Sequence, residues 1–184
     1  MKKNTKKKIL ILALVICLLA LVSYSTLAYR TAYGRATNVV TTGGIRLELL
    51  ETFPEGGYKV IPGASYEKVV TVKNTGGHDA WVRLKLVKQV DAPAGTPAPN
   101  PEKALSYTLL PGWTAAADGY VYYNKVLKPG ETTTAAIDSV QIVGREVLTE
   151  HSGATLVLAV SAQGVQYEHN ETANAWEASG WPVD

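Results

Sequence analysis

The stretch Ala80–Val90, AWVRLKLVKQV, decides the fold. Apolar side chains stand at alternate positions, namely Ala80, Val82, Leu84 and Leu86. Polar side chains fall between and after them, namely Arg83, Lys85 and Gln89. Because successive side chains of a strand point to opposite faces, this pattern predicts a strand with one buried face and one face in water. A strand of that kind is typical of an antiparallel sheet.

Segments on both sides of this strand carry strand-forming patterns, separated by Gly and Pro. Upstream, Tyr66–Asn74 alternates in the same way, and Asn74–Asp79 predicts a hairpin connection into Ala80. Downstream, the pattern returns in residues 105–110, 119–127, 132–143 and 155–166, while the proline-rich residues 91–103 predict a surface loop. About six to eight strands at this spacing predict an all-β fold, an antiparallel β-sandwich of jelly-roll or immunoglobulin-like type.

The N-terminus has the three-part build of a secretory signal peptide. Five lysines precede an unbroken apolar run, Ile9–Val22, and the small residues that follow predict cleavage between Ala28 and Tyr29. The run is shorter than the roughly 20 residues of a membrane-spanning helix. Counting on to Ala28 reaches that length, so a retained membrane anchor is the alternative. We therefore divide the chain into a signal peptide helix (1–28), an N-terminal arm (29–44) and a β-sandwich domain (45–184).

The arm itself has the composition of a strand. Residues 29–42, YRTAYGRATNVVTT, are rich in Tyr, Thr and Val and contain no acidic residue. A β-forming arm can pair with the exposed strand edge of another copy, and Gly43 and Gly44 would form its hinge. We predict strand donation through one central group of arm residues, namely Thr37, Val39, Val40 and Thr41. The alternative is that the arm folds back as an edge strand of its own domain.

Charge and cysteine content narrow the classes of partner. The first 28 residues hold five lysines and no acid, so 13 of the 18 Lys and Arg remain against 16 Asp and Glu. With no basic patch of interleaved aromatic residues, we predict no nucleic-acid partner, and membrane contact only through the signal segment. The single cysteine, Cys17, lies in the apolar run, so the mature chain has no thiol and depends on burial of its core.

The sequence contains no catalytic pattern. The three histidines, His78, His151 and His169, do not fall in a His-Glu-x-x-His arrangement, and no Gly-x-Ser-x-Gly motif occurs. One candidate metal set exists if two loops meet in space, and it consists of Glu150, His151, His169 and Glu171. We predict a protein that is not an enzyme and has no cofactor. A secreted metallopeptidase that uses the candidate set remains the alternative from another class.

Several segments of the chain together form a pattern seen in a known protein family. The signal ends in Ser25–Tyr29 and is followed by Ala36–Val40 and Gly44–Leu49. These segments resemble the export signal and first strand of the TasA/camelysin family, exported biofilm-matrix and surface proteins of Gram-positive bacteria. The Pro62-Gly63 turn with the Asn74-Thr75-Gly76 hairpin, and the segment Leu127–Thr132, resemble further family elements.

The resemblance implies a jelly-roll-like sandwich, export through the dedicated signal peptidase SipW, and fibres in which an arm completes a neighbour's sheet. Its expected partners are copies of the same chain or other matrix proteins, besides the signal peptidase during export. It also brings the camelysin-like metallopeptidase as a rival activity, which the missing zinc motif puts in doubt. A membrane-anchored surface binding module is the third alternative.

Overall fold

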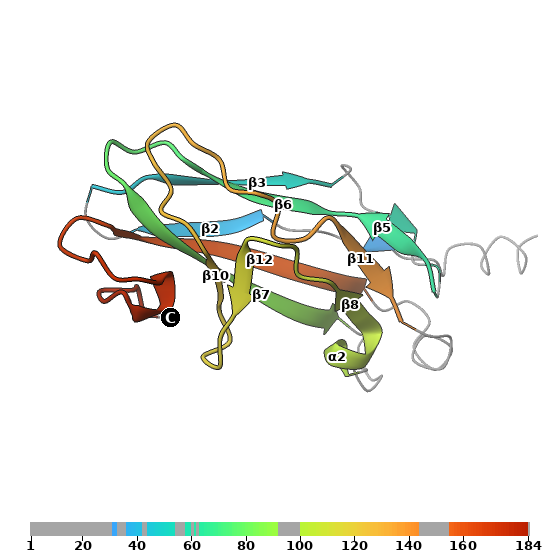
Figure 1. The fold of residues 1–184 in the computed structure, drawn as a ribbon. Helices are drawn as coiled ribbons and strands as arrows, with labels where there is room; N and C mark the ends of the chain where they lie inside the picture. Colours follow the sequence, from blue (N-terminus) through green and yellow to red (C-terminus); the bar gives the residue numbers. More distant parts are fainter. Residues whose placement is uncertain are drawn as a thin grey trace, which may run out of the picture.

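The computed structural model describes residues 31–32, 36–41, 44–53, 58–59, 61, 63–91, 100–143 and 155–183. These residues form an all-β sandwich with antiparallel sheets, so the predicted fold class is confirmed (Figure 1). The predicted signal helix and the Ala28–Tyr29 bond lie outside the described residues. Within those residues, no helix is both long and apolar enough to cross a bilayer.

One layer is a five-stranded sheet with the order β2-β12-β7-β10-β9. Its strands are β2 (Ala36–Thr41), β12 (Thr155–Gln166), β7 (Ala80–Asp91), β10 (Val121–Tyr123) and β9 (Trp113–Ala115). The stretch that decides the fold is β7, and it pairs antiparallel with β12 from Ala80↔Gln166 to Asp91↔Thr155. The edge strand β2 pairs with β12 in the parallel direction.

The other layer is built from two smaller sheets. In one, β3 (Leu47–Thr52) pairs with β6 (Val69–Asn74). In the other, β11 (Ser139–Ile142) lies between β5 (Ser65–Glu67) and β8 (Leu105–Tyr107). The chain that leads into β11 also bonds to β6, since Ala136 N donates to Val70 O and Thr133 N donates to Val72 O.

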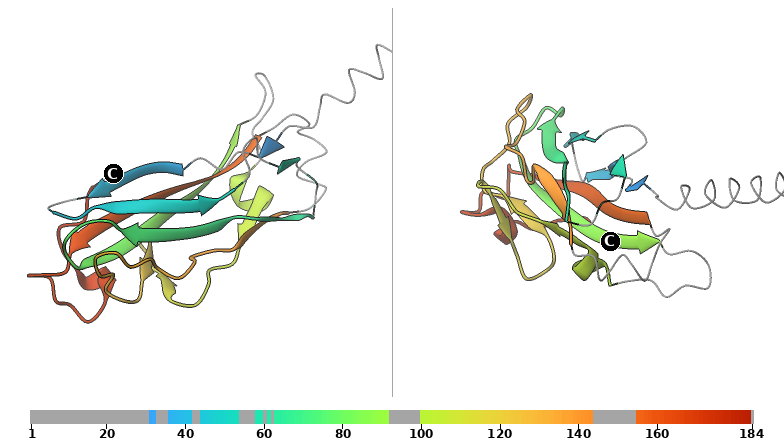
Figure 2. Two further views of the ribbon diagram at one scale, coloured as in Figure 1. Left: turned by 90° about the horizontal axis from the view of Figure 1, so that it is seen from above. Right: turned by 90° about the vertical axis from the view of Figure 1, so that its right-hand side faces the viewer.

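Four short elements complete the described structure. The strand β1 (Thr31–Ala32) pairs antiparallel with β4 (Tyr58–Lys59). The single-turn helix α2 (Pro101–Ala104) precedes β8, and the 3-10 helix η2 (Ala175–Glu177) lies in the C-terminal segment. Figure 2 shows this segment, drawn in red, gathered at one end of the sandwich.

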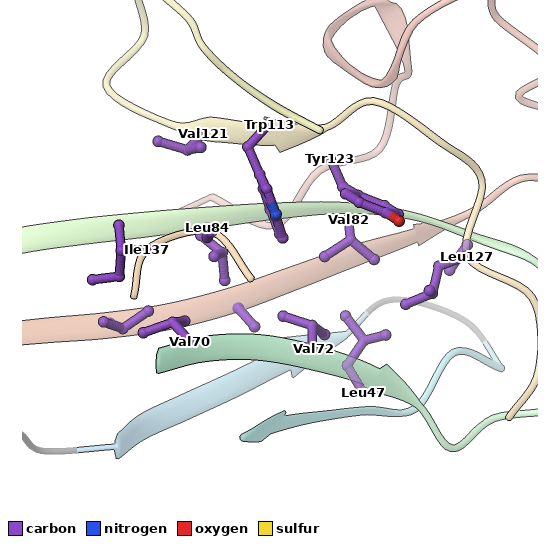
Figure 3. Close-up of a cluster of buried hydrophobic side chains, with 14 of the residues drawn as sticks. Leu47, Val70, Val72, Val82, Leu84, Trp113, Val121, Tyr123, Leu127 and Ile137 are labelled. Atoms are coloured by element: carbon purple, nitrogen blue, oxygen red, sulfur yellow. The ribbon is translucent and has the colours of Figure 1, made fainter. Parts of the chain in front are cut away.

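The core fills the space between the two layers. Figure 3 shows Val82 and Leu84 of β7 opposite Val70 and Val72 of β6, with Leu127 closing one end. The alternation within Ala80–Val90 therefore predicted the inward side of β7 correctly at its first three positions, whereas Leu86 is only partly buried.

Arg83 differs from the prediction. The alternation placed it in water, but its exposed fraction is only 7%. The C-terminal segment covers the outer face of the main sheet at this end, so both faces of β7 are buried here. Gln89, farther along the same outer face, is exposed as predicted.

Candidate assembly site

The arm is an edge strand of its own domain in this structure. Its strand β2 pairs with β12 through Ala36↔Val160, Val39↔Ala162, Val40↔Gln163 and Thr41↔Gly164. This arrangement is the fold-back alternative of the sequence analysis. Donation of the predicted residues Thr37, Val39, Val40 and Thr41 to another copy stays a prediction, since a single chain shows only what its own arm does.

The edge of β12 that receives the arm is shaped by small residues. Ala162 is fully buried, and Gly164 lies beneath Ile45 and Leu47, which belong to the segment that follows the arm. A Cβ atom on Gly164 would come within 2.7 Å of Leu47 Cδ1 and 3.2 Å of Ile45 Cγ2. A side chain at this position would therefore push away the segment that connects the arm to the domain.

The connection from the arm into β3 is held by residues Asn74–His78, which we call the anchor loop. The backbone N–H groups of Thr75 and Gly76 both donate to Arg46 O, at 2.8 and 3.1 Å. A Cβ atom on Gly76 would lie 2.7 Å from Arg46 N, so glycine lets the two backbones approach this closely. The anchor loop thus fixes the chain directly after the predicted hinge.

The two hinge glycines differ in what surrounds them. Gly43 lies outside the described residues. Gly44 lies against the anchor loop, since a Cβ atom there would be 3.0 Å from His78 Cδ2 and 3.3 Å from His78 Nε2. Gly44 therefore lies close to the anchor loop, and its role as part of the hinge stays a prediction.

The shape of the anchor loop depends on Asn74, whose exposed fraction is 0%. Its side-chain Nδ2 donates to His78 O at 2.8 Å and to Leu127 O at 3.0 Å. Its Oδ1 accepts from Gly76 N at 2.9 Å. These hydrogen bonds close the anchor loop and join the end of β6 to the chain around Leu127, so every hydrogen-bonding position that this buried amide uses has a structural role.

The predicted metal ligands are not brought together in the described part. Glu150 and His151 lie outside it. His169 adopts a φ of 65°, and its backbone N–H donates to Glu171 Oε1 at 3.0 Å. That hydrogen bond lowers the pKa of the Glu171 carboxyl. Among the residues that the structure describes, no group of three or more His, Cys, Asp or Glu could hold a metal ion.

A second polar centre lies on the outer face of the main sheet, where residues 167–183 form what we call the C-terminal clasp. Three nitrogen atoms of Arg83 are engaged there. Nε donates to Gln163 Oε1 at 2.8 Å, Nη1 to the Tyr122 hydroxyl at 3.2 Å, and Nη2 to Pro182 O at 2.9 Å. The guanidinium carbon also lies 3.6 Å from the Tyr120 ring centre and 4.6 Å from that of Trp181.

Asp118 completes this centre. Its Oδ2 accepts from the Tyr122 hydroxyl at 2.6 Å, and its Oδ1 accepts from Tyr120 N at 3.0 Å. Burial raises the pKa of Asp118, but these hydrogen bonds and the charge of Arg83 outweigh it, so the pKa lies below its usual value. Burial and the same carboxylate raise the pKa of Tyr122. The centre is therefore an ionised network that ties the C-terminal clasp to the sheet.

Asn170, which matches a glycosylation acceptor in the sequence, has a structural role in the clasp. Its Nδ2 donates to Ser179 O at 2.9 Å, and its Oδ1 accepts from Ser179 N at 3.0 Å. Its backbone oxygen accepts from Trp81 Nε1 at 3.0 Å. A glycan on Nδ2 would compete with the bond that closes the clasp.

Comparison with protein-family models, with curated proteins and with solved structures gives no match. The resemblance to the TasA/camelysin family therefore stays a prediction that rests on the quoted segments.

Proposed function

We propose that this chain is an exported structural protein of the extracellular matrix or cell surface, of the kind found in the TasA/camelysin family. It assembles into fibres by exchanging its N-terminal arm between copies. The observation that carries the proposal is the placement of β2, an edge strand whose sheet neighbour is β12 and which is joined to the domain by a glycine connection. A terminal edge strand can be replaced by the same strand of a neighbour with no change in the pairing.

The energetics of the exchange follow from that symmetry. Every hydrogen bond that β2 makes with β12 is lost when the arm leaves and is regained when another copy supplies the arm. The equilibrium between the closed monomer and the exchanged form therefore depends on the subunit concentration and on the free energy needed to extend the glycine connection between the arm and the domain. Because the anchor loop clamps Gly44–Arg46, the body of the domain keeps its shape while the arm moves. Head-to-tail repetition of such a contact builds an open filament.

A disulfide trap tests this proposal. Val39 is the register partner of Ala162 in the pairing of β2 with β12, so the double variant Val39→Cys, Ala162→Cys reports which copy supplies the arm. Cys17, the single native cysteine, is changed to Ser in the same chain. We expect a disulfide within one chain in dilute monomer. In assembled material we expect disulfides between chains, seen as a ladder on a non-reducing gel.

The matched control is Val39→Cys with Val143→Cys, which places the second thiol at an exposed site outside the main sheet. It should give no ladder. Filaments in which all Val39–Ala162 disulfides remain within single chains would refute arm exchange.

Export is tested separately by the mass of the mature N-terminus. We expect a chain that begins near Tyr29, which frees the arm from the signal segment. An intact apolar segment on surface-exposed protein would favour the membrane-anchored alternative.

A further inference from the structure

One carboxyl group and one amine occupy core positions where β3 meets the start of β6. Along β3, Glu51 follows Leu47 and Leu49 at alternate positions, and these two leucines belong to the core. Lys68 comes two residues before the buried Val70 of β6 and is itself only 1% exposed. Glu51 pairs with Val70 in the register of the two strands, so Lys68 is a diagonal neighbour that long side chains can bridge.

The two groups meet in a site closed to solvent. The side chains of Lys68 and Glu51 are 1% and 6% exposed, and Lys68 Nζ lies 3.2 Å from Glu51 Oε2. The ring centre of Phe53 lies 5.1 Å from the same Nζ. Within the described part of the chain, neither Lys68 Nζ nor Glu51 Oε1 has a hydrogen-bond partner. The site therefore holds a buried nucleophile directly beside a carboxyl group.

The backbones on both sides fix this contact. The strands β3 and β6 pair without interruption from Leu47↔Asn74 to Thr52↔Val69. At Lys68 the chain passes from β5 to β6 (Figure 1), and Lys68 N donates to Asp138 O at 2.9 Å. Groups that a fold holds at such a distance react as if each were present at a very high concentration.

A permanent ion pair is poorly supported at this site. Removal of two charges from water is compensated only where the geometry is good and further hydrogen bonds satisfy the remaining atoms. Lys88 and Glu102, at the surface, make a hydrogen bond of 2.6 Å, whereas Lys68 Nζ makes none with the described residues. A reaction that removes both charges would remove this unfavourable contribution.

We propose that Lys68 and Glu51 condense to an amide, an isopeptide bond within one chain. A proton first passes from Lys68 Nζ to Glu51 Oε2, which leaves a neutral amine and a carboxylic acid. The lone pair of Nζ then attacks Glu51 Cδ, and the hydroxyl at Oε2 leaves with one proton from Nζ as water. One N–C bond forms and one C–O bond breaks, so the step needs neither an oxidant nor a cofactor.

The bond ties β3 to the junction of β5 and β6. The single cysteine, Cys17, cannot form a disulfide within one chain, and an amide between side chains gives a covalent cross-link without a thiol. A cross-link restricts the unfolded chain and so stabilises the folded one. This inference does not depend on arm exchange, because the two groups belong to the same domain.

Mass spectrometry of the full chain in denaturant tests the proposal. We expect a mass below that of the sequence, counted from the observed N-terminus, by one water molecule. Trypsin does not cleave after an acylated lysine, so residues 47–59 and 60–73 should appear as one joined fragment. The Lys88–Glu102 pair is the control in the same molecule. Its atoms are closer, but the Glu102 side chain is 71% exposed, so trypsin should cleave after Lys88.

Lys68→Arg is the matched variant, since it keeps the positive charge and removes the amine. It should have the full mass of its sequence, and trypsin should cleave after position 68. An unchanged chain that has its full mass and releases fragment 60–68 would overturn the proposal. The same holds if the lost water maps to other residues or is also missing from Lys68→Arg. The result is read on the unchanged chain, so it stands whether or not the variant folds and whether or not fibres form.

Discussion

Replacement of Asn74 by alanine should destabilise the whole sandwich, although Asn74 stands at the end of a strand beside a turn. The side chain is completely buried, and its amide makes three hydrogen bonds, to His78 O, Leu127 O and Gly76 N. Asn74→Ala removes all three and leaves two carbonyl oxygens and one N–H without these partners. At about 1 kcal/mol for each hydrogen bond, we expect a loss of about 2–4 kcal/mol in the free energy of unfolding.

The assay is urea denaturation followed by tryptophan fluorescence, where the midpoint should fall without a change in the m-value. Asn124→Ala is the matched control. Asn124 is exposed, and its Oδ1 accepts one hydrogen bond, from the Thr114 hydroxyl at 2.9 Å. We expect its loss to stay within about 0.5 kcal/mol.

A second substitution at the same site separates hydrogen bonding from size. Asn74→Asp keeps the acceptor for Gly76 N but turns a carboxylate oxygen toward His78 O and Leu127 O. Burial of an unpaired charge against two carbonyl oxygens should make it more damaging than Asn74→Ala. If both variants unfold at the same urea concentration as Asn124→Ala, the anchor loop does not depend on Asn74 and the argument is wrong.

Three other predictions use the same preparations. Leu84→Ala should lower the free energy of unfolding by about 2–5 kcal/mol as a core truncation, and Arg83→Ala by about 2–4 kcal/mol through its three buried hydrogen bonds. Gln89→Ala, on the exposed part of β7, should lower it by under about 1 kcal/mol. If Arg83→Ala and Gln89→Ala unfold at the same urea concentration, the C-terminal clasp does not bury Arg83 in the way described. Gly76→Ala should lower the melting temperature, because its Cβ would meet Arg46 N at 2.7 Å. Gly77→Ala, with open space around it, should leave the melting temperature nearly unchanged. Similar shifts in the two variants would contradict the close approach of the Gly76 and Arg46 backbones. Because the folded-state pKa of Asp118 is lowered, the carboxylate contributes its full stabilisation above the ordinary pKa of an aspartate, about 3.9, and this contribution is lost as the pH falls below that value. The urea midpoint of Asp118→Asn should therefore fall less on acidification than that of the unchanged chain. If the two midpoints fall equally, Asp118 makes no such contribution.

The sequence predicted the inner face of the fold well and its outer face poorly. Val82 and Leu84 lie in the core because alternation with a period of two leaves one choice of buried side. Arg83 was misplaced because the pattern of β7 carries no information about a distant segment. The segment that covers it, Tyr167–Val183, has no strand or long helix in the described structure and so gives no periodic signal. Its Trp and Pro residues are the feature from which burial could have been inferred.

The candidate site was predicted in part. The composition of residues 29–42 predicts a strand, and β2 is one. Whether that strand stays with its own domain depends on the free energies of two arrangements with the same pairing, and local sequence does not separate them. The anchor loop was predicted as a hairpin connection. Its clamp on Gly44–Arg46 depends on backbone contacts between segments that are far apart in the chain, which no local pattern reveals.

The parallel pairing of β2 with β12 has a consequence for the order in which the protein is made. The strand β2 lies near the N-terminus, and its only sheet neighbour in the described structure is β12, the last described strand to be synthesised. Contacts of such long sequence separation form late, because the intervening chain must first be closed into a loop. Throughout synthesis β2 therefore remains without this partner. Under the proposed export and arm exchange, the arm of a molecule already outside the cell could pair with β12 of a newly exported chain before that chain's own arm does.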